Sequence, residues 1–383
     1  MKVHQFHVDP ACPRDVDDDR HVAVAAGADL LLVFGTPQAL ESHGWFDALR
    51  ADFAGARIAG CSTAGNISRR GVTDDTVTVT AVKFDSGRPR IACVPFEAGA
   101  GSHAAGLALA RALDFPGLGD AIVFGQGVGV NGSALIAGMR EGLAPGVRIS
   151  GGLAGDCGAF RRTLVMTDNG PSDRHMVAIG FDDAHLRVGL GSFGGWHPFG
   201  PERQVTHADG NVLHALDDTP ALEIYKRYLG DYARDLPASG LLFPFSMRGA
   251  DRGDKGLIRT ILGIDESRGS LILAGDVEPG GYLQLMHASP DDLVDGAESA
   301  AERATASHAA AGDRLALLVS CVGRRLVLGD RAEEEVEAVS GVLGPDAICT
   351  GFYSNGEIGP SAAGDGSCLH NQTMTLGCWQ ELA

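Results

Sequence analysis

The sequence lacks the features that mark membrane, nucleic-acid-binding and secreted proteins. No apolar run reaches the length that spans a bilayer. The formal net charge is −18 and Lys and Arg are never gathered in long runs, which argues against a surface that holds a phosphate backbone or an anionic membrane. The start, MKVHQFHVDPACPRD, has no positively charged end followed by an apolar stretch, so no signal peptide is predicted. We therefore expect a cytoplasmic protein with neither nucleic acid nor membrane as a partner.

Cysteine motifs are also lacking. The eight cysteines are scattered, with no CxxC pair and no CxxCH motif for covalent haem. This favours reduced thiols and gives no support to a zinc site. Cys61 and Cys321 each follow an apolar run. A catalytic thiol needs a nearby base and a lowered pKa, whereas free cysteines are usually small buried apolar residues. We therefore expect no enzyme.

Repetition is what the sequence does have. Three segments, residues 30–67, 121–156 and 315–358, share one order: a short apolar run, a helical pattern, a second apolar run and a glycine-rich polar stretch. Hydrophobic residues make up 44% of the 383 residues, enough for a globular protein of two or three domains. The pattern predicts an α/β fold with mixed sheets, built from repeated strand–helix–strand units.

A different pattern occupies residues 200–290. A helix over DDTPALEIYKRYLGDYA is followed by a segment that reads as three strands joined by turns. We place a domain boundary near residue 200, which divides the chain into halves of residues 1–200 and 201–383. We expect the two halves to share a pocket.

The glycine-rich stretches are the first candidate site. IAGCSTAGNI in the first repeat aligns with CTGFYSNGEI in the third, so Gly60 matches Gly351 and Asn66 matches Glu357. Ligands of α/β proteins gather outside the carboxyl ends of strands, where backbone N–H groups can hold an anion. The alternative is that the glycines only make tight turns and that Glu357 caps local N–H groups. The predicted ligand-binding residues here are Gly60, Cys61, Ser62, Thr63, Gly65, Asn66, Tyr353, Ser354, Gly356 and Glu357.

Arg324, in SCVGRR, follows a predicted strand. It can bind a ligand carboxylate in a bidentate manner, or it can be a solvated loop residue.

Five motifs in order resemble the FIST family, named after F-box and intracellular signal-transduction proteins. They are GCSTAGNI, the hinge segment GWHPFGPERQVTHADGNVLHALDDTPALEIYKRYLG, SCVGRR, GFYSNGEIGP and LHNQTMTL, and they cover almost the whole chain. In one respect the chain departs from the family, because the first glycine loop usually ends Gly-Glu and here ends Gly65-Asn66. The resemblance implies a sensor of small ligands, with amino acids as one proposed class.

Some bacterial members of the family are haem proteins that sense nitric oxide and act on a partner histidine kinase, so the resemblance implies a haem cofactor and a kinase partner in trans. The candidate iron ligands are His197, which lies among aromatic residues at the predicted junction, and His370, which follows the Glu357 loop. Two alternatives stay open: a haem-free sensor of an amino acid or other small metabolite, and an enzyme that uses Cys61.

Overall fold

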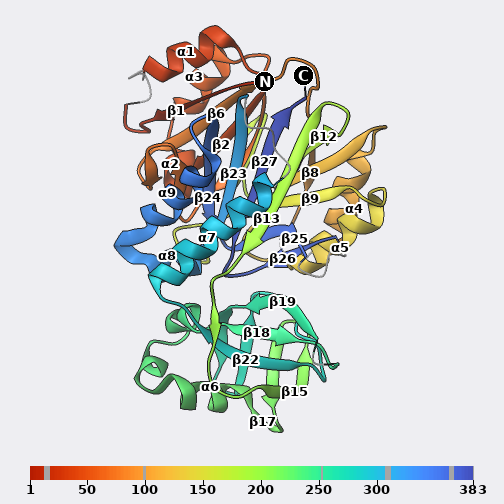
Figure 1. Ribbon diagram of the computed structural model, residues 1–383, viewed down its shortest axis with the longest axis vertical. Helices are drawn as coiled ribbons and strands as arrows, with labels where there is room; N and C mark the ends of the chain where they lie inside the picture. The colour runs from red at the N-terminus through yellow and green to blue at the C-terminus, as the bar shows by residue number, and fades with distance from the viewer. Residues whose placement is uncertain (13–17, 98–100, 252, 307–311, 362–365, 383) are drawn as a thin grey trace.

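The computed structural model describes residues 1–12, 18–97, 101–251, 253–306, 312–361 and 366–382. Three α/β units form the upper body of the molecule, and a smaller β-rich domain lies below them (Figure 1). None of the helices in these described ranges is long and apolar enough to cross a membrane.

Each unit contains strands and helices in the same order. The first unit comprises β1 (Lys2–Val8), α1 (Asp18–Ala26), β2 (Leu30–Gly35), α2 (Pro37–Glu41), α3 (Trp45–Asp52), β3 (Arg57–Ser62), β4 (Asn66–Ser68), β5 (Gly71–Thr73) and β6 (Val77–Lys83). The second comprises β7 (Arg90–Pro95), α4 (Ser102–Leu113), β8 (Leu118–Gly125), α5 (Gly132–Gly142), β9 (Arg148–Leu153), β10 (Val165–Thr167), β11 (Gly170–Ser172) and β12 (His175–Asp182). The third comprises β13 (Leu186–Phe193), α7 (Pro290–Thr305), β23 (Arg314–Cys321), α8 (Val322–Leu328), η3 (Gly329–Arg331), α9 (Ala332–Leu343), β24 (Ala347–Ser354), β25 (Gly356–Pro360), β26 (Ser367–His370) and β27 (Met374–Glu381).

The predicted repeats are confirmed by the strand pairing. In each unit the two strands of the repeat are parallel neighbours: β2 with β3, β8 with β9, and β23 with β24. Gly60, Gly151 and Gly351 occupy equivalent positions, with φ of +142°, +119° and +158°. A Cβ there would lie 2.0, 2.2 and 1.8 Å from a carbonyl oxygen of the neighbouring strand, so only glycine fits.

The three units exchange hairpins in a ring. The β4–β5 hairpin of the first unit pairs with β24 of the third. The β25–β26 hairpin of the third pairs with β9 of the second, and the β10–β11 hairpin of the second pairs with β3 of the first. Each six-stranded sheet is therefore completed by a neighbouring unit.

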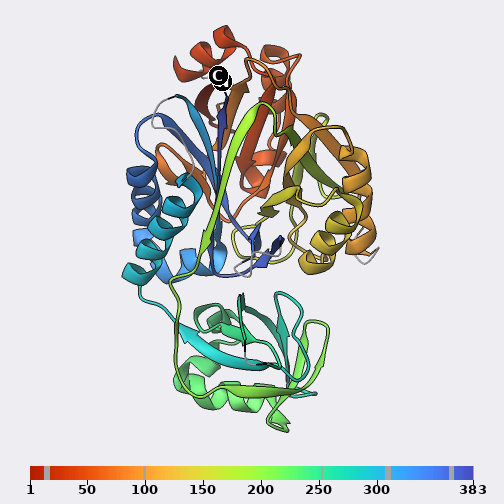
Figure 2. The same cartoon turned by 45° about the vertical axis from the view of Figure 1, so that its right-hand side comes forward.

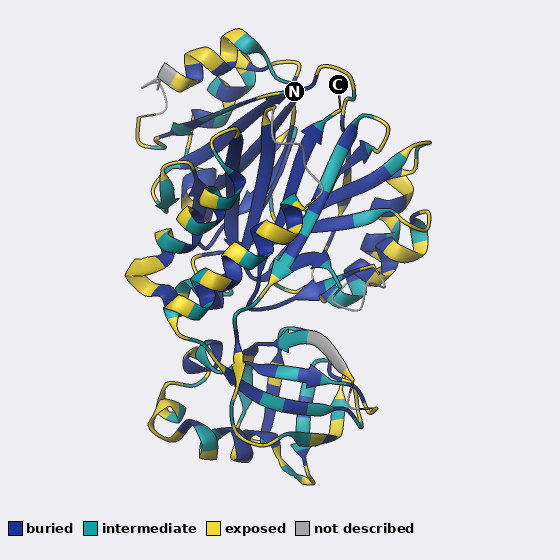
Figure 3. Cartoon of the chain, viewed as in Figure 1, coloured by how far each residue is buried: buried dark blue, intermediate teal, exposed yellow. Residues whose placement is uncertain are grey.

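The centre of the body is a packed apolar core. One face each of β2, β8 and β23 contributes to a single cluster of buried residues. Figure 3 shows that most of the strands in the body are buried. The rings of Phe34, Phe124 and Phe352 contact one another there, with centroids 5.1 to 6.1 Å apart. This core leaves the strand ends and the loops as places for a site.

The β-rich domain is inserted into the third unit between β13 and α7 (Figure 2). It comprises β14 (His197–Pro198), β15 (Arg203–Asp209), β16 (Val212–Leu216), β17 (Thr219–Pro220), α6 (Ala221–Leu229), η1 (Gly230–Asp235), η2 (Ala238–Leu242), β18 (Phe245–Arg248), β19 (Asp254–Arg259), β20 (Ile261–Asp265), β21 (Ser270–Leu273) and β22 (Tyr282–His287). The segment predicted as three strands thus forms four, because β19 and β20 are separated at Thr260. The predicted boundary at residue 200 falls just inside this insertion, and the sheet of the third unit is built from residues on both sides of it.

The inserted domain contacts the body at the carboxyl ends of the parallel strands. There α8 packs on η2, and β26 lies against β19. Two hydrogen bonds meet at Gln372: its carbonyl accepts from Trp196 Nε1 at 2.8 Å, and its Nε2 donates to the Leu241 carbonyl at 2.8 Å. The junction between the two bodies is where the clefts described next are found.

Candidate ligand-binding clefts

The two predicted glycine loops lie side by side. Ala64 N–H donates to the Tyr353 carbonyl and Tyr353 N–H donates to the Gly65 carbonyl, both at 2.8 Å. The two loops, which align in sequence, are also alike in structure, because the same hydroxyl contact occurs in each. Thr63 Oγ1 lies 2.7 Å from Asn66 Oδ1, and Ser354 Oγ lies 2.6 Å from Glu357 Oε1. All four of these side chains are fully buried and hydrogen-bonded within their own loops. The loops thus shape the backbone, and their polar side chains are turned inward.

Cys61 and Cys321, the two cysteines considered as nucleophiles, are buried, and so is Ser62. Cys61 lies in the central apolar core, and burial raises its pKa well above that of a free thiol. Burial also raises the pKa of Cys321. Ser62 Oγ donates to the Gly155 carbonyl at 2.7 Å and accepts from Leu164 N–H at 2.9 Å. These thiols are protonated at neutral pH, so the geometry gives no support to a nucleophile here.

Glu357 is a buried acid, and in the part of the chain that the structure describes its hydrogen-bond partners include no cation. Burial raises its pKa to about 8. Its Oε1 lies 2.6 Å from the Ser354 hydroxyl, and its Oε2 lies 3.2 Å from both the N–H and the hydroxyl of Thr373. A neutral carboxyl group satisfies all three contacts, which favours the capping role over ligand binding.

Arg324 does bind a carboxylate, but that carboxylate belongs to the same chain. Its Nη2 lies 2.8 Å from Glu335 Oε2, and both side chains are fully buried. Its Nε also donates to Glu335 Oε2, at 3.1 Å, and Nη1 and Nη2 donate to the carbonyl groups of Gly194 and Leu293. With every donor nitrogen engaged, Arg324 holds α8, α9 and the entrance to the inserted domain together.

Arg325, the next residue, reaches the surface of the largest of the clefts described here, which we call the large cleft. Its volume is about 890 Å³. All three units and the inserted domain contribute to it: Ala64 from the first, 157–160 from the second, Val322, Arg325 and Leu326 from the third, and 235–238, Leu241, Ile261 and Leu262 from the insertion. Most of this lining is apolar, and the charged side chains among these residues are Arg325 and Asp235.

The Arg325 guanidinium is held in place from several sides. It forms a bidentate ion pair with Asp74, at 2.9 and 2.7 Å, and its carbon lies 5.3 Å from the centre of the Tyr353 ring. A Cβ on Gly65 would lie 2.5 Å from Arg325 Nη1, so this glycine makes room for the guanidinium. The Arg325 side chain stays 26% exposed, and that of Asp74 45%. Arg325 was not predicted from the sequence, because the choice between adjacent arginines depends on where α8 begins.

Both predicted histidines line a second cleft, of about 560 Å³, on the same junction. We call it the histidine cleft. His197 lies in a less apolar setting than predicted: its side chain is 58% exposed and its Nε2 lies 3.1 Å from Asp292 Oδ1. The aromatic residues next to His197 in the sequence therefore do not enclose it, because β14 lies at the surface.

His370 is buried, and burial lowers its pKa to about 4. Its Nε2 lies 2.9 Å from the Pro360 carbonyl, which can only accept, so this nitrogen carries the hydrogen. The Nε2 atoms of both imidazoles are thus engaged by oxygen atoms of the chain. In this arrangement neither Nε2 is available to bind iron, and haem binding stays a prediction.

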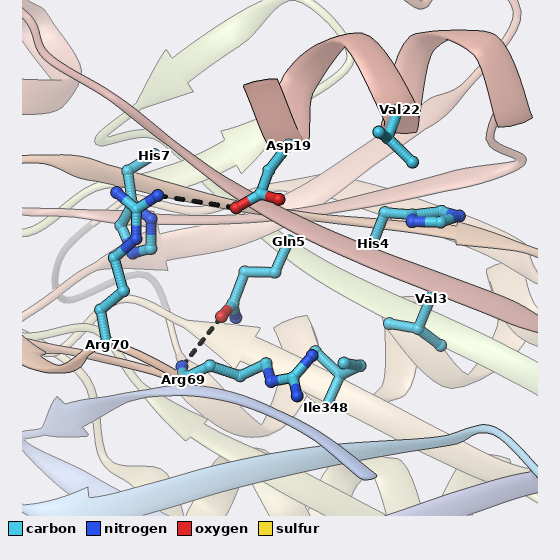
Figure 4. Close-up of a pocket in the computed structure, with 9 residues that line it drawn as sticks. All are labelled: Val3, His4, Gln5, His7, Asp19, Val22, Arg69, Arg70 and Ile348. Carbon is cyan, nitrogen blue, oxygen red and sulfur yellow. Dashed lines mark hydrogen bonds and ion pairs between the residues drawn. The ribbon is translucent and has the colours of Figure 1, made fainter. Parts of the chain in front are cut away.

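A small cavity of about 240 Å³ lies beneath α1, at the end of the body away from the inserted domain (Figures 1 and 4). Arg70 pairs with Asp19 at 3.6 Å, and Gln5 Oε1 accepts from the Arg69 N–H at 2.9 Å. These polar groups bind one another, and the cavity is the smallest of those described here. It is a weaker candidate than the junction clefts.

Comparison with known proteins identifies two family domains in order. The FIST N domain matches residues 29–219 and the FIST C domain matches residues 221–360. A search of curated proteins gave no match. Among solved structures, cyanuric acid hydrolase from A. caulinodans aligns over 100% of this chain and 99% of its own, with 11% sequence identity and a TM-score of 0.37. A likeness this weak carries no conclusion about activity.

Proposed function

The chain belongs to the FIST family of small-ligand-sensing signal-transduction domains, and we propose that it senses a small zwitterion with an apolar body, such as an apolar amino acid, in the large cleft. The observation that carries the proposal is the convergence of three units and the inserted domain on one mostly apolar cleft with Arg325 in its wall. Its volume lies in the usual range for small-molecule sites.

Arg325 is the group that meets the ligand carboxylate. Its present partner, Asp74, is partly exposed, and partly exposed ion pairs contribute little to stability. A ligand carboxylate can therefore take the place of Asp74 in a bidentate pair at small cost. Asp235, on the opposite body, forms no ion pair within the described residues and is available to an ammonium group. The leucines of both bodies meet the apolar part.

Signalling follows from the two-sided lining of the cleft. A ligand that contacts both Arg325 and the η1–η2 segment stabilises the arrangement in which the inserted domain is held against the body. This differential contact shifts the population toward a closed junction that a partner can recognise. A histidine kinase, the partner implied by the resemblance, stays a prediction.

The test is a ligand panel scored by thermal shift and calorimetry. A ligand at about 100 times its Kd stabilises the native state by about 2.7 kcal/mol. We expect apolar amino acids to bind, and analogues that lack either the carboxylate or the amine to bind at least tenfold more weakly. Arg325→Met should abolish binding, whereas Arg227→Met should not, because Arg227 lies in an exposed pair with Glu223 away from the cleft. Equal binding to both variants would overturn the proposal.

The haem prediction needs a separate measurement. Protein expressed with added haem precursor should show no stoichiometric Soret band if the engaged histidines are not iron ligands. A full Soret band that is lost in His370→Ala but kept in His103→Ala would instead place haem in the histidine cleft.

A further inference from the structure

The histidine cleft has a cation in its wall that finds no acidic partner among the residues that the structure describes. Arg303, in the last turn of α7, is an exposed residue that lines this cleft. No carboxylate in the described ranges lies at ion-pair distance from it. The positions three and four residues away on either side of Arg303 hold Ser or Ala, so α7 itself offers no acidic neighbour. This cation can therefore pair with an anion from outside the chain.

Close packing of α7 on β13 places Arg303 at the edge of the cleft. A Cβ on Gly191 would lie 2.0 Å from the Ala300 carbonyl oxygen, so this glycine lets the helix lie directly on the strand. The Arg303 guanidinium carbon lies 4.7 Å from the centre of the Phe193 ring, and Nη1 donates to the Ser192 carbonyl at 3.3 Å. Within the described residues these contacts leave Nε and Nη2 without a protein acceptor. The planar guanidinium can thus present two donors to a carboxylate.

Apart from Arg303 and the two histidines, the lining of the cleft is uncharged. His370 is neutral at pH 7, because burial lowers its pKa to about 4, and the His197 imidazole is engaged by Asp292. Phe193 is 37% exposed, so an apolar surface is open to a ligand next to the guanidinium. The apolar side chains of the lining come from both bodies: Leu190, Phe193 and Trp196 from β13 and the linker that follows it, and Leu257, Ile258 and Met286 from the inserted domain.

The charges of this cleft differ from those of the large cleft. The large cleft has both a cation, Arg325, and a carboxylate, Asp235. The histidine cleft has Arg303 but no acidic side chain among the described residues that line it. An ammonium group would lose water here without gaining an anionic partner, which is costly, whereas a carboxylate on an apolar body meets both a cation and an apolar surface. The volume of about 560 Å³ lies in the usual range for small-molecule sites.

We propose that the histidine cleft is a second ligand site, which binds a small carboxylate with an apolar body, of the aryl- or alkylcarboxylate class. Arg303 pairs with the carboxylate, while Phe193 and the apolar side chains of both bodies contact the rest of the ligand. Because β13, the linker and strands β18, β19 and β22 all contribute to the lining, the bound ligand favours the arrangement in which the two bodies are held together. This inference is independent of the ligand proposed for the large cleft.

Trp196 gives the experiment a local signal. It lines the cleft, whereas the other two tryptophans, Trp45 and Trp379, are buried in other clusters of the core. The full chain is titrated with 3-phenylpropionate, and binding is followed by tryptophan fluorescence and by calorimetry. We expect saturable binding that changes the fluorescence. The uncharged analogue 3-phenylpropanol has the same apolar body and should bind about tenfold more weakly, because it cannot form the charged hydrogen bonds with Arg303.

Variants identify the cation that binds the probe. Arg303→Gln should weaken the binding of 3-phenylpropionate about tenfold, and Arg303→Lys, which keeps the charge but not the planar guanidinium, should have an intermediate effect. Arg111→Gln is the matched control and should keep the wild-type affinity, because Arg111 is an exposed arginine in the last turn of α4, in the second unit.

Three results would overturn the inference. The first is the absence of saturable binding to the wild-type protein, and the second is binding of 3-phenylpropanol as tight as that of the acid. The third is a folded Arg303→Gln variant with the wild-type affinity, which would mean that Arg303 only stabilises the carboxyl end of α7, where a cation is favourable.

Discussion

Replacement by glutamine should change the free energy of unfolding in opposite directions at two buried glutamates. Glu357 has a pKa raised from 4.5 to about 8 by burial, whereas Glu335 forms an ion pair with Arg324. Between pH 4.5 and about pH 8, the native state keeps a proton on Glu357 that the unfolded state releases. The free energy of unfolding of the wild type therefore falls as pH rises across this window, by about 1.4 kcal/mol per pH unit.

Glu357→Gln removes this dependence. The amide can donate to Ser354 and accept from Thr373, as the neutral acid does, so the variant should fold at every pH. Relative to wild type, its free energy of unfolding should rise between pH 5 and 9 by about 4 kcal/mol. Other titrating groups contribute equally to both proteins and cancel in the difference.

The assay is urea unfolding of both proteins at several pH values. Parallel pH profiles would refute the reasoning, because they would mean that Glu357 titrates alike in the native and unfolded states. Glu335→Gln is the control. It leaves Arg324 as an unpaired buried cation, and it should cost about 3–5 kcal/mol.

Two further predictions follow from the same structure. Gly351→Ala places a Cβ 1.8 Å from the Leu318 carbonyl oxygen and should prevent or severely destabilise folding, while Gly341→Ala in α9, where a Cβ meets nothing within 4 Å, should stabilise by about 0.5–1 kcal/mol in thermal unfolding. Burial raises the pKa of Asp120 to about 6. The free energy of unfolding of Asp120→Asn should therefore rise relative to that of the wild type between pH 4 and 6, provided that the variant keeps the hydrogen bond from Trp379 Nε1. A difference between the two proteins that stays constant across this range in urea unfolding would contradict the prediction.

The repeats could be predicted because they leave local signals. An apolar run before a helical pattern marks a strand wherever it occurs, and three copies reinforce one another. The hairpin exchange leaves no such signal. Strands as short as Asn66–Ser68 and Val165–Thr167 carry too few residues for periodicity, and their partners are set by packing between units.

The sequence indicated segments that lie next to the large cleft, but not the side chains that line it. The glycine loops do meet at the carboxyl ends of strands, and Ala64 and Arg325 border residues that the sequence had indicated. Which side chains face outward depends on the rotation of short elements such as α8. The burial of Glu357 depends on the pairing of β25 with β9 and β26, and the exposure of His197 depends on the place of β14 beside β22. No local pattern encodes these long-range pairings.

The ring of hairpins has a consequence for synthesis at the ribosome. β4 leaves the ribosome early, but its partner Gly351 belongs to a strand made near the end of the chain. β9 likewise lacks its partner strand until β25 has been synthesised. Until then both the hairpin and the strand expose unpaired backbone edges, which are templates for wrong partners. A nascent chain that stalls before residue 356 would leave β9 open, so we expect truncated products to depend on chaperones far more than the full-length protein does.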